Sequence, residues 1–322
     1  MSKVSIVIPC HNDGAHLDDA VKSALAQTWS EVVIVDDGST DPATLRLLES
    51  MDDPSVRVFH QPNAGPAAAR NRAIQEARGE YILPLDADDL LQLTYAAKAA
   101  AVLDTRPDVG IVYCRATKFG AEEGPWDLPA FSPDELALGN VIFASAMFRR
   151  ADWEGVGGFD ETLRHGMEDY DFWIRLVYAG RKVVRLDETL FHCRVRERSR
   201  TALFEEDREL VVATYARIFR KNRDFFAEHA DSLFRRQFAL VKEVAALDTR
   251  LAEESRSADT ERARLVQAKA EADRYNVALR SELEHLQVEL EQARAQCAAM
   301  QRRFRLLKPL WPGKKPHNRT PE

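Results

Sequence analysis

Short apolar runs alternate with segments of helical spacing through the N-terminal part of this 322-residue chain. Runs rich in strand-forming residues occupy positions 4–9, 32–35, 56–59 and 81–85. Segments of helical periodicity separate them, over residues 16–29, 44–51 and 65–77. Strands that alternate with helices predict a mostly parallel α/β sheet flanked by helices, with right-handed crossovers. In such sheets ligands bind beyond the carboxyl ends of the strands, where the polar clusters of this chain lie.

Further along the chain, the same patterns predict a helix, a strand and a long loop. We expect an alanine-rich helix between Leu90 and Leu103, followed by a strand over residues 109–114. Glycine and proline spacing indicates a loop over residues 119–135. Strand-like character resumes over residues 140–149, chiefly in residues 141–144.

Three carboxylates follow the apolar run that begins at Tyr81. Because side chains alternate faces along a strand, Asp86 and Asp88 are expected to point the same way while Asp89 turns aside. Two carboxylates on one face repel each other unless a cation lies nearby, and oxygen ligands suit Mg²⁺ or Mn²⁺. The alternative is an Asp-rich turn that caps the next helix, a role open to Asp89.

Charge and cysteine usage narrow the class of protein. The net charge of −7 argues against a general nucleic-acid binder. The cysteines Cys10, Cys114, Cys193 and Cys297 form no Cys-x-x-Cys pair, which fits a reducing compartment better than a zinc site or a disulfide framework. With no leader-like start and no apolar run of ~18 residues, we expect a cytoplasmic protein, with peripheral contact at the inner face of the membrane left open.

The loops after the strands exclude two common nucleotide folds and resemble a third. The Gly-x-Gly-x-x-Gly of a dinucleotide-binding fold and the Gly-Lys-Ser/Thr of a P-loop are both missing. Four stretches resemble, in order and spacing, those of glycosyltransferase family 2 of the bacterial polysaccharide type: residues 4–9, 35–41, 63–71 and 85–89. The resemblance covers roughly residues 1–205. It implies a GT-A catalytic domain and an inverting sugar transfer.

The resemblance assigns donor-binding roles to residues in these loops. It implies that Asp37 accepts a hydrogen bond from the imide of uracil or an equivalent base, and that Pro9 shapes the floor of that pocket. Asp36 is left a turn or helix-capping role. Asn63 and Arg70 lie on the stretch that lines the diphosphate and donor sugar, although Arg70 could equally hold the Asp cluster or be a surface residue.

Two further pairs of acidic residues complete the implied site. The resemblance implies that Asp86 contacts ribose or sugar hydroxyls and that Asp88 binds the metal. Glu168 and Asp169 open a predicted helix, where acidic residues are often merely stabilising. The resemblance instead implies that Asp169 removes the proton from the acceptor hydroxyl and that Glu168 orients the site.

A basic segment follows the next predicted strand. Arg194, Arg196 and Arg198 alternate and could clamp the donor phosphates, with a solvated basic loop as the alternative. Family members often carry a metal-binding His near the position of Arg196. Here the histidine is His192, which departs from that pattern, so a structural role competes with metal binding.

The C-terminal part changes character. Helices over residues 206–244 are expected to pack on the catalytic domain, followed by a coiled coil over 245–308 and a basic disordered tail over 309–322. A heptad seam supports the coiled coil: Leu279, Leu283, Leu286, Leu290, Ala293, Cys297, Met300, Phe304 and Leu307. This seam predicts a homo-oligomer or a coiled-coil partner protein, unless the helix folds back on its own domain. Basic and apolar residues over 302–315 suit an anionic membrane surface, with a solvated tail as the alternative.

Together these features predict an inverting, metal-assisted glycosyltransferase. It would move a sugar from a nucleoside diphosphate sugar, UDP being the commonest in the family, to a glycan or lipid-linked glycan acceptor. A nucleotidyltransferase is the competing enzyme, but the Gly-rich basic loop usual after its first strand is missing. A coiled-coil scaffold with an inactive transferase domain is the other alternative. Against it, Asp37, Asp86, Asp88 and Asp169 are all present.

Overall fold

A computed structural model describes residues 3–28, 30–196, 200, 204, 206–271, 288 and 292. These residues fall into two compact units, residues 1–229 and 230–322, which are treated separately below. The strands of the first unit are β1 (Val4–Cys10), β2 (Ser30–Asp37), β3 (Val56–Gln61), β4 (Tyr81–Pro84), β5 (Leu90–Leu91), β6 (Val109–Gly120), β7 (Gly124–Trp126), β8 (Met147–Arg149) and β9 (Lys182–Val195). Its helices are α1 (Gly14–Leu25), α2 (Pro42–Glu49), α3 (Pro66–Glu76), α4 (Tyr95–Thr105), α5 (Pro133–Leu138), α6 (Arg150–Val156), α7 (Glu168–Tyr178), α9 (Arg208–Lys221) and α10 (Arg223–Glu228).

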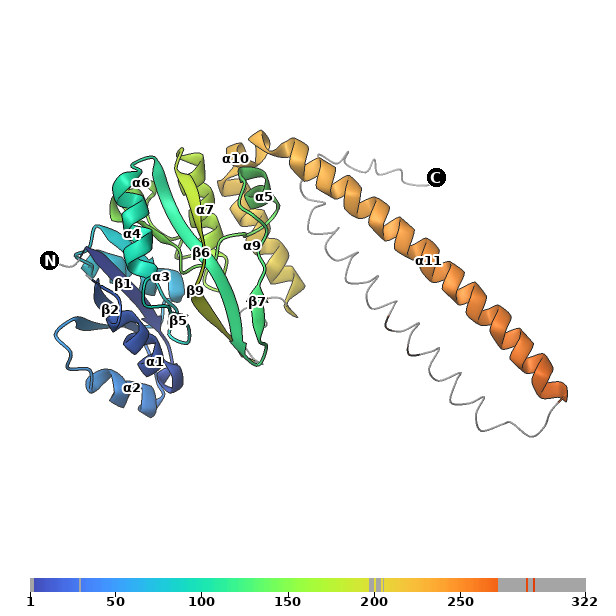
Figure 1. The fold of residues 1–322 in the computed structure, drawn as a ribbon, viewed down its shortest axis with the longest axis horizontal. Helices are drawn as coiled ribbons and strands as arrows, with labels where there is room; N and C mark the ends of the chain where they lie inside the picture. Colours follow the sequence, from blue (N-terminus) through green and yellow to red (C-terminus); the bar gives the residue numbers. More distant parts are fainter. Residues whose placement is uncertain are drawn as a thin grey trace, which may run out of the picture. The chain divides into compact units, whose positions relative to one another are not determined.

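The strands described in this unit form one mixed sheet in the order β3-β2-β1-β4-β8-β6-β9-β5, with β7 paired to β6. Strands β3, β2, β1 and β4 are parallel, and so are the two longest strands, β6 and β9 (Figure 1). The short strands β5, β7 and β8 pair antiparallel with their neighbours. The predicted α/β class is confirmed, and the parallel half carries the predicted polar loops at its carboxyl edge.

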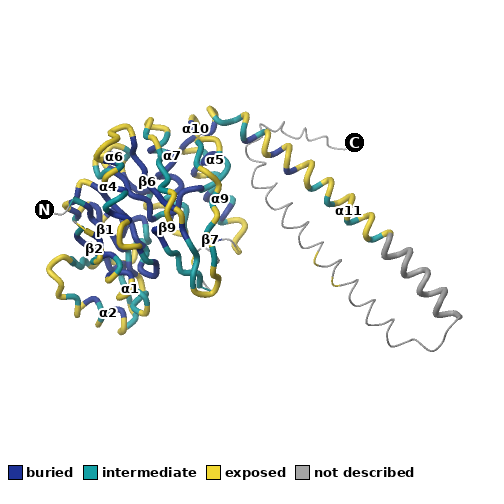
Figure 2. Tube along the Cα trace, in the orientation of Figure 1, coloured by how far each residue is buried: buried dark blue, intermediate teal, exposed yellow. Residues whose placement is uncertain are grey.

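The central strands are buried on both faces, as their unbroken apolar sequences predicted (Figure 2). Helix α3 packs on β1 and β2, whereas α4 packs on β6, β8 and β9. Helices α5 and α6 both contact α7. Helix α7 therefore packs against the two helices that precede it in the sequence.

Several predicted boundaries were wrong. Strand β4 ends at Pro84, so Asp86 and Asp88 lie in a turn and the face-alternation argument does not apply to them. Residues 141–144 form no strand, and the strand of that region is β8. The predicted loop over residues 119–135 contains β7 and the start of α5. Strand β6 continues to Gly120, and the chain then turns back so that β7 pairs with β6. Residues Leu90–Leu91 pair with β9 before helix α4 begins at Tyr95.

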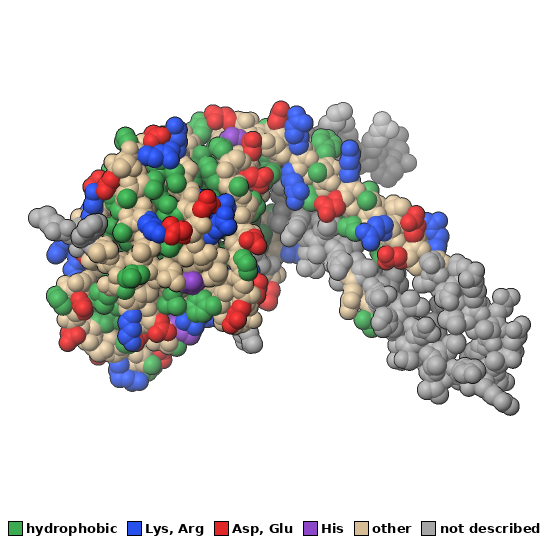
Figure 3. All heavy atoms as spheres, viewed as in Figure 1, with side chains coloured by type: hydrophobic (Ala, Val, Ile, Leu, Met, Phe, Trp, Pro, Cys, Tyr) green, Lys and Arg blue, Asp and Glu red, His purple; other side chains and the backbone are tan. Residues whose placement is uncertain are grey.

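The second unit begins with the long helix α11 (Ala230–Glu271). The heptad seam from Leu279 to Leu307 and the basic tail lie outside the described residues, apart from isolated positions, so the coiled coil and the tail stay predictions. In the part of the chain that is described, no helix is long and apolar enough to cross a bilayer. On the face shown in Figure 3, acidic and basic side chains are interspersed.

Candidate active site

The Asp37 carboxylate organises the loop that follows β3. Its Oδ1 accepts hydrogen bonds from the Gln61 side chain and the Ala64 N–H, and its Oδ2 accepts from the Gly65 N–H, each at 2.8 Å. A carboxylate has about four acceptor positions, so this group can still accept from a ligand. Three short bonds hold it in one orientation at the carboxyl edge of the sheet.

A close backbone approach joins this loop to the end of β2. Gly38 has φ +72°, and a Cβ there would lie 2.7 Å from the Asn63 N. Only glycine tolerates both conditions. Asn63 is exposed, and its Nδ2 lies 3.2 Å from the Nδ1 of His11. The same His11 nitrogen lies 2.9 Å from the Asp37 carbonyl oxygen. Pro9 pairs with Val35 on the neighbouring strand, one residue before the end of β1.

Asp36 stabilises the turn after β2, which is one of the two roles predicted for it. Its Oδ1 accepts from the Ser39 N–H at 2.9 Å, and its Oδ2 pairs with the His60 Nδ1 at 2.9 Å. Burial raises the pKa of Asp36, but these hydrogen bonds outweigh burial and hold the pKa below its usual value. Asp36 therefore closes the turn, while Asp37 faces the loop after β3.

Arg70 links the two acidic motifs. It lies on α3 and is 1% exposed, and its guanidinium donates to Asp86 through one terminal nitrogen and to Glu168 through the other. Burial would lower the pKa of Arg70, but the carboxylates around it raise the pKa and keep the group charged. The surface-residue alternative for Arg70 is wrong. Asp86 and Glu168, which follow Arg70 by 16 and 98 residues, therefore both bind this one side chain.

A second arginine is paired with Asp88. The Arg196 guanidinium lies 2.6 Å from the Asp88 Oδ2 and donates to the Asp13 Oδ1 at 2.7 Å. Burial raises the pKa of Asp88 to about 6; Asp86 also raises it, and Arg196 opposes the shift. Asp13, in the loop after β1, was not singled out from the sequence, although it lies in the polar cluster that follows that strand.

The neighbouring acid, Asp89, holds the basic segment in place. Its Oδ1 accepts from the Arg194 N–H at 2.8 Å, so it does not cap the next helix. Arg194 also donates from Nε to the Asp88 carbonyl at 3.0 Å, and its guanidinium lies over the Phe119 ring. Arg198 lies outside the described residues. Arg194 is therefore held by contacts within the protein. Of the two described arginines predicted to clamp the phosphates, Arg196 has the more exposed side chain.

Both ring nitrogens of His192 are engaged. Its Nδ1 lies 2.6 Å from the Thr117 hydroxyl and its Nε2 lies 3.0 Å from the Gln92 side-chain nitrogen. Burial lowers the pKa of His192, which favours the neutral ring that these contacts require. In this arrangement neither nitrogen is available to a metal, and the predicted ligand role has no support in the geometry.

Asp169 lies at the first turn of α7 and is held at both oxygens. Its Oδ1 accepts from the Tyr170 N–H at 2.8 Å, and its Oδ2 accepts from the Asn140 side chain at 2.9 Å. Burial raises the pKa of Asp169 to about 6, Glu168 raises it further, and Arg70 opposes the shift. A carboxylate with this pKa is suited to take up a proton near neutral pH.

Asn71, the residue after Arg70, fastens α3 to the glycine-rich loop before α7. Its Nδ2 donates to the Phe159 carbonyl at 2.9 Å, while its Oδ1 accepts from the Phe159 N–H and the Trp153 indole. Gly158 has φ +74°, and a Cβ there would lie 2.9 Å from that Oδ1. Gly158 is therefore required for this contact. A role for Asn71 was not predicted, although it follows Arg70 directly in the sequence.

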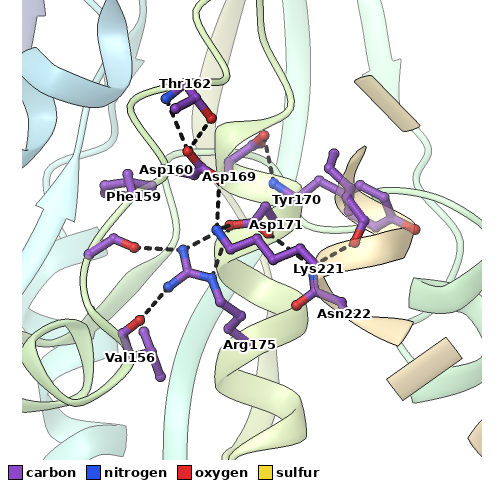
Figure 4. Close-up of polar contacts among 12 residues, drawn as sticks. Val156, Phe159, Asp160, Thr162, Asp169, Tyr170, Asp171, Arg175, Lys221 and Asn222 are labelled. Atoms are coloured by element: carbon purple, nitrogen blue, oxygen red, sulfur yellow. Dashed lines mark hydrogen bonds and ion pairs between the residues drawn. The ribbon is translucent and has the colours of Figure 1, made fainter. Parts of the chain in front are cut away.

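A buried ion cluster joins α7 to the end of α9 (Figure 4). Asp171 is fully buried and accepts from Arg175 at 2.9 Å, from Lys221 at 2.8 Å and from Asn222 at 2.9 Å. Lys221 also donates to Asp160 of the glycine-rich loop at 2.9 Å. The loop, the first turn of α7 and the extension after the sheet therefore share one set of ion pairs close to Asp169.

Asp88 is a candidate carboxylate ligand for a hard divalent cation. Burial, and then the Asp86 charge, raise the pKa of Asp88, while the Arg196 cation lies between Asp88 and Asp13 and opposes that shift. Within the described residues, no group of three or more His, Cys, Asp or Glu side chains surrounds one point. Mg²⁺ and Mn²⁺ commonly take one or two carboxylates and complete their shell with phosphate oxygens and water.

Two family models match this chain. One, described as "Glycosyl transferase family 2", matches residues 5–157, and the other, described as "N-terminal domain of galactosyltransferase", matches residues 142–197. The first match contains the Asp37, Arg70 and Asp88 segments. The second contains Glu168, Asp169 and the basic segment.

Curated relatives resemble part of the chain. The chondroitin synthase of Escherichia coli is 34% identical over 187 residues, which are 55% of this chain and 27% of that protein. An uncharacterized glycosyltransferase of E. coli K12, YibD, is 36% identical over 182 residues, or 52% of each chain. The chain spans only 19 to 27% of the length of the first four curated relatives.

Solved structures share the fold. S. aureus TarS 1–349 in complex with UDP-GlcNAc superposes with a TM-score of 0.58 at 20% identity, over 72% of this chain and 73% of that one. The mannosyltransferase PcManGT from Pyrobaculum calidifontis, in complex with GDP-Man and Mn²⁺, gives a TM-score of 0.58 at 20% identity over 95% and 86% of the two chains.

Proposed function

Because this chain belongs to glycosyltransferase family 2 and has the GT-A fold, we propose that it transfers a sugar from a nucleoside diphosphate sugar to a glycan acceptor, with inversion. The family and the fold are those predicted from the loop motifs. The donor, the acceptor and the residue roles are the proposal. The relatives named chondroitin and hyaluronan synthases support a polysaccharide as the acceptor.

One observation carries this proposal. The Arg70 guanidinium binds Asp86 and Glu168 together, so the turn that holds Asp88 and the helix start that holds Asp169 meet at one buried cation. A transferase needs its leaving-group site and its base close to the same reacting carbon. An inactive scaffold would have no need to bury so many charges together, because each buried charge costs free energy unless it is paired.

The loop around Asp37 is suited to the donor nucleotide. Its carboxylate is held rigidly by three donors and retains acceptor capacity for one imide N–H. Such a group discriminates by hydrogen bonding, because a base without that donor would leave a buried carboxylate position unpaired. Asn63 and Pro9 border this loop and would contact the same nucleotide.

The chemistry we assign to Asp169 is that of a general base. The acceptor oxygen attacks the anomeric carbon as the bond from that carbon to the diphosphate oxygen breaks. The acceptor proton passes to Asp169, and the electron pair of the broken bond leaves on the nucleoside diphosphate. Attack from the face opposite to the leaving group inverts the configuration. Glu168, 2% exposed and bound to Arg70, orients the site without taking that proton.

Asp88 is the residue we assign to a divalent cation. When bound, such a cation would offset the charge that develops on the departing diphosphate. Among the described residues, Arg70, Arg196 and Arg200 are cationic side chains that pair with the acids of this site. Arg196 is free to exchange its carboxylate partners for phosphate oxygens, because its side chain is 38% exposed.

The test is calorimetric binding of UDP, GDP and dTDP, each with and without Mn²⁺. Wild type is compared with Asp88→Ala and with Asp187→Ala, an exposed acid whose side chain is 79% accessible. We expect one nucleotide to bind in a Mn²⁺-dependent manner to wild type and Asp187→Ala, and this dependence to be lost in Asp88→Ala. A screen of the matching nucleotide sugars for release of the nucleoside diphosphate then identifies the donor.

Folded wild-type protein that binds none of the three nucleotides would contradict the proposal and favour the scaffold alternative. Retention of Mn²⁺-dependent binding by Asp88→Ala would leave the transferase in place but remove Asp88 as the metal ligand.

A further inference from the structure

We propose that Asn140 is a positioning residue for the general base, and that it aims the Asp169 carboxylate at the acceptor hydroxyl from the segment between α5 and β8. This inference rests on the proposed function, since it assumes that Asp169 is the base. Asn140 carries no signal in the sequence, because it lies outside every acidic, basic and glycine-rich motif.

The contacts of Asn140 define which way its amide points. Its Oδ1 lies 3.3 Å from the Ile142 N–H, which donates to it, so its Nδ2 is the atom that faces Asp169. That nitrogen donates to the Asp169 Oδ2 at 2.9 Å, while Oδ1 of the same carboxylate accepts from the Tyr170 N–H. Each carboxylate oxygen is therefore held by one donor, and the donors come from two different segments of the chain.

The segment that presents Asn140 is well anchored. Before Asn140, the Tyr170 hydroxyl of α7 donates to the Leu136 carbonyl of α5 at 2.8 Å. After Asn140, Ile142 is completely buried and Phe143 stacks on Phe191 with ring centroids 4.6 Å apart. A donor held on both sides can fix the orientation of a carboxylate, whereas a donor on a free loop could not.

The charges that face Asp169 give this hydrogen bond a measurable effect. Glu168 lies on the same turn of α7 and disfavours a second negative charge, while Arg70 on α3 favours it. Asp86 and Arg200 lie beyond, as partners of Arg70 and Glu168. A donor to the charged form lowers the pKa of the carboxylate, so its loss should raise that pKa.

The experiment measures the pH dependence of turnover for Asn140→Ala and Asn140→Asp, with the nucleotide sugar identified in the screen. A hydrogen bond to a charged group corresponds to about one pKa unit or more, so the acid limb should move upward by about one pH unit in Asn140→Ala. Asn140→Asp should move it further, because it adds a like charge beside the base. The nucleotide affinity should be unchanged in both variants.

Ser132→Ala is the matched control. It weakens α5 by removing the helix cap but leaves the Asn140 contact to Asp169 in place, so its acid limb should match that of wild type. A pH-titrated infrared difference spectrum, with the Asp169 band assigned by its loss in Asp169→Asn, reports the same shift without any turnover.

Acid limbs and infrared titrations that coincide for wild type, Asn140→Ala and Asn140→Asp would overturn the role of Asn140. An equal shift in Ser132→Ala would also overturn it, because the effect would then come from the stability of α5. Near wild-type turnover by Asp169→Asn is a separate result, which would remove the base assignment itself.

Discussion

Asp37 and Asp169 lie at the same edge of the sheet but are held in different ways. Asp37 accepts from three neutral donors, all supplied by residues 61–65. Asp169 has two such donors, supplied by segments far apart in the chain, and it faces the Glu168 carboxylate and the Arg70 guanidinium. One carboxylate is part of a locally built loop, and the other is part of a network of charges.

The difference separates recognition from chemistry. Neutral donors that surround a carboxylate fix its position, and such a group is suited to bind a nucleobase. A carboxylate in a network of opposing charges has a protonation state that depends on its neighbours, and such a group is suited to move a proton. Substitutions in the two regions should therefore affect different measurements.

The largest effect is expected from Asp169→Asn. The amide cannot accept a proton, so turnover should fall by about 10³-fold, within the range that general base catalysis contributes. Nucleotide affinity measured by calorimetry should stay at the wild-type value, because Asp37 and its loop are untouched. Weaker nucleotide binding in this variant would show that the two regions are not separate.

The next effect is on stability. Arg70→Met leaves Glu168 and Asp86 without their buried partner, and the free energy of unfolding should fall by about 3 kcal/mol. This lies at the low end for a buried pair because the Asp86 side chain is 35% exposed. Urea unfolding of this variant and of Arg72→Met measures the difference. Arg72, also on α3, makes an exposed ion pair with Glu76 and lies over the Phe59 ring, so its removal should cost about 1 kcal/mol or less.

An intermediate effect is expected from Asp37→Asn. The amide nitrogen would face the N–H of Ala64 or Gly65, so the free energy of unfolding should fall by about 1–2 kcal/mol. Because this loop would then be less well held, nucleotide affinity should fall about tenfold. The pH profile of turnover should keep its shape. Asp41→Asn, which changes the cap of α2 in a neighbouring turn, is the matched control and should leave the affinity unchanged. An equal loss of affinity in both variants would contradict recognition by Asp37.

The smallest effect is a pH dependence at Asp88. Its pKa is raised to about 6, so the carboxylate becomes protonated as the pH falls through 6 and loses its charge for a cation. Mn²⁺-dependent nucleotide binding should therefore weaken by about fivefold between about pH 6 and about pH 5. Calorimetry at a series of pH values measures it. Affinity that does not change across this range would contradict metal binding by the Asp88 carboxylate.

Much of the fold could be predicted from local patterns. The strands β1 to β4 and the helices between them begin and end within a few residues of the predicted limits, because each apolar run is short and bounded by polar or glycine-containing turns. The region from Gly120 to β8 could not be predicted in this way. There β6 continues past its apolar run and pairs with β7 and β9, so long-range pairing outweighs local propensity.

The sequence by itself determined the alternation of strands and helices as far as β4, a turn or helix-capping role for Asp36, and the resemblance to glycosyltransferase family 2. Only the tertiary structure decided which charges meet. In the folded protein Arg70 binds Glu168, 98 residues away, and Asn140 donates a hydrogen bond to Asp169. Both ring nitrogens of His192 contact neighbouring side chains. Local periodicity depends on neighbours in the chain, whereas pKa values and hydrogen bonds in a site depend on neighbours in space.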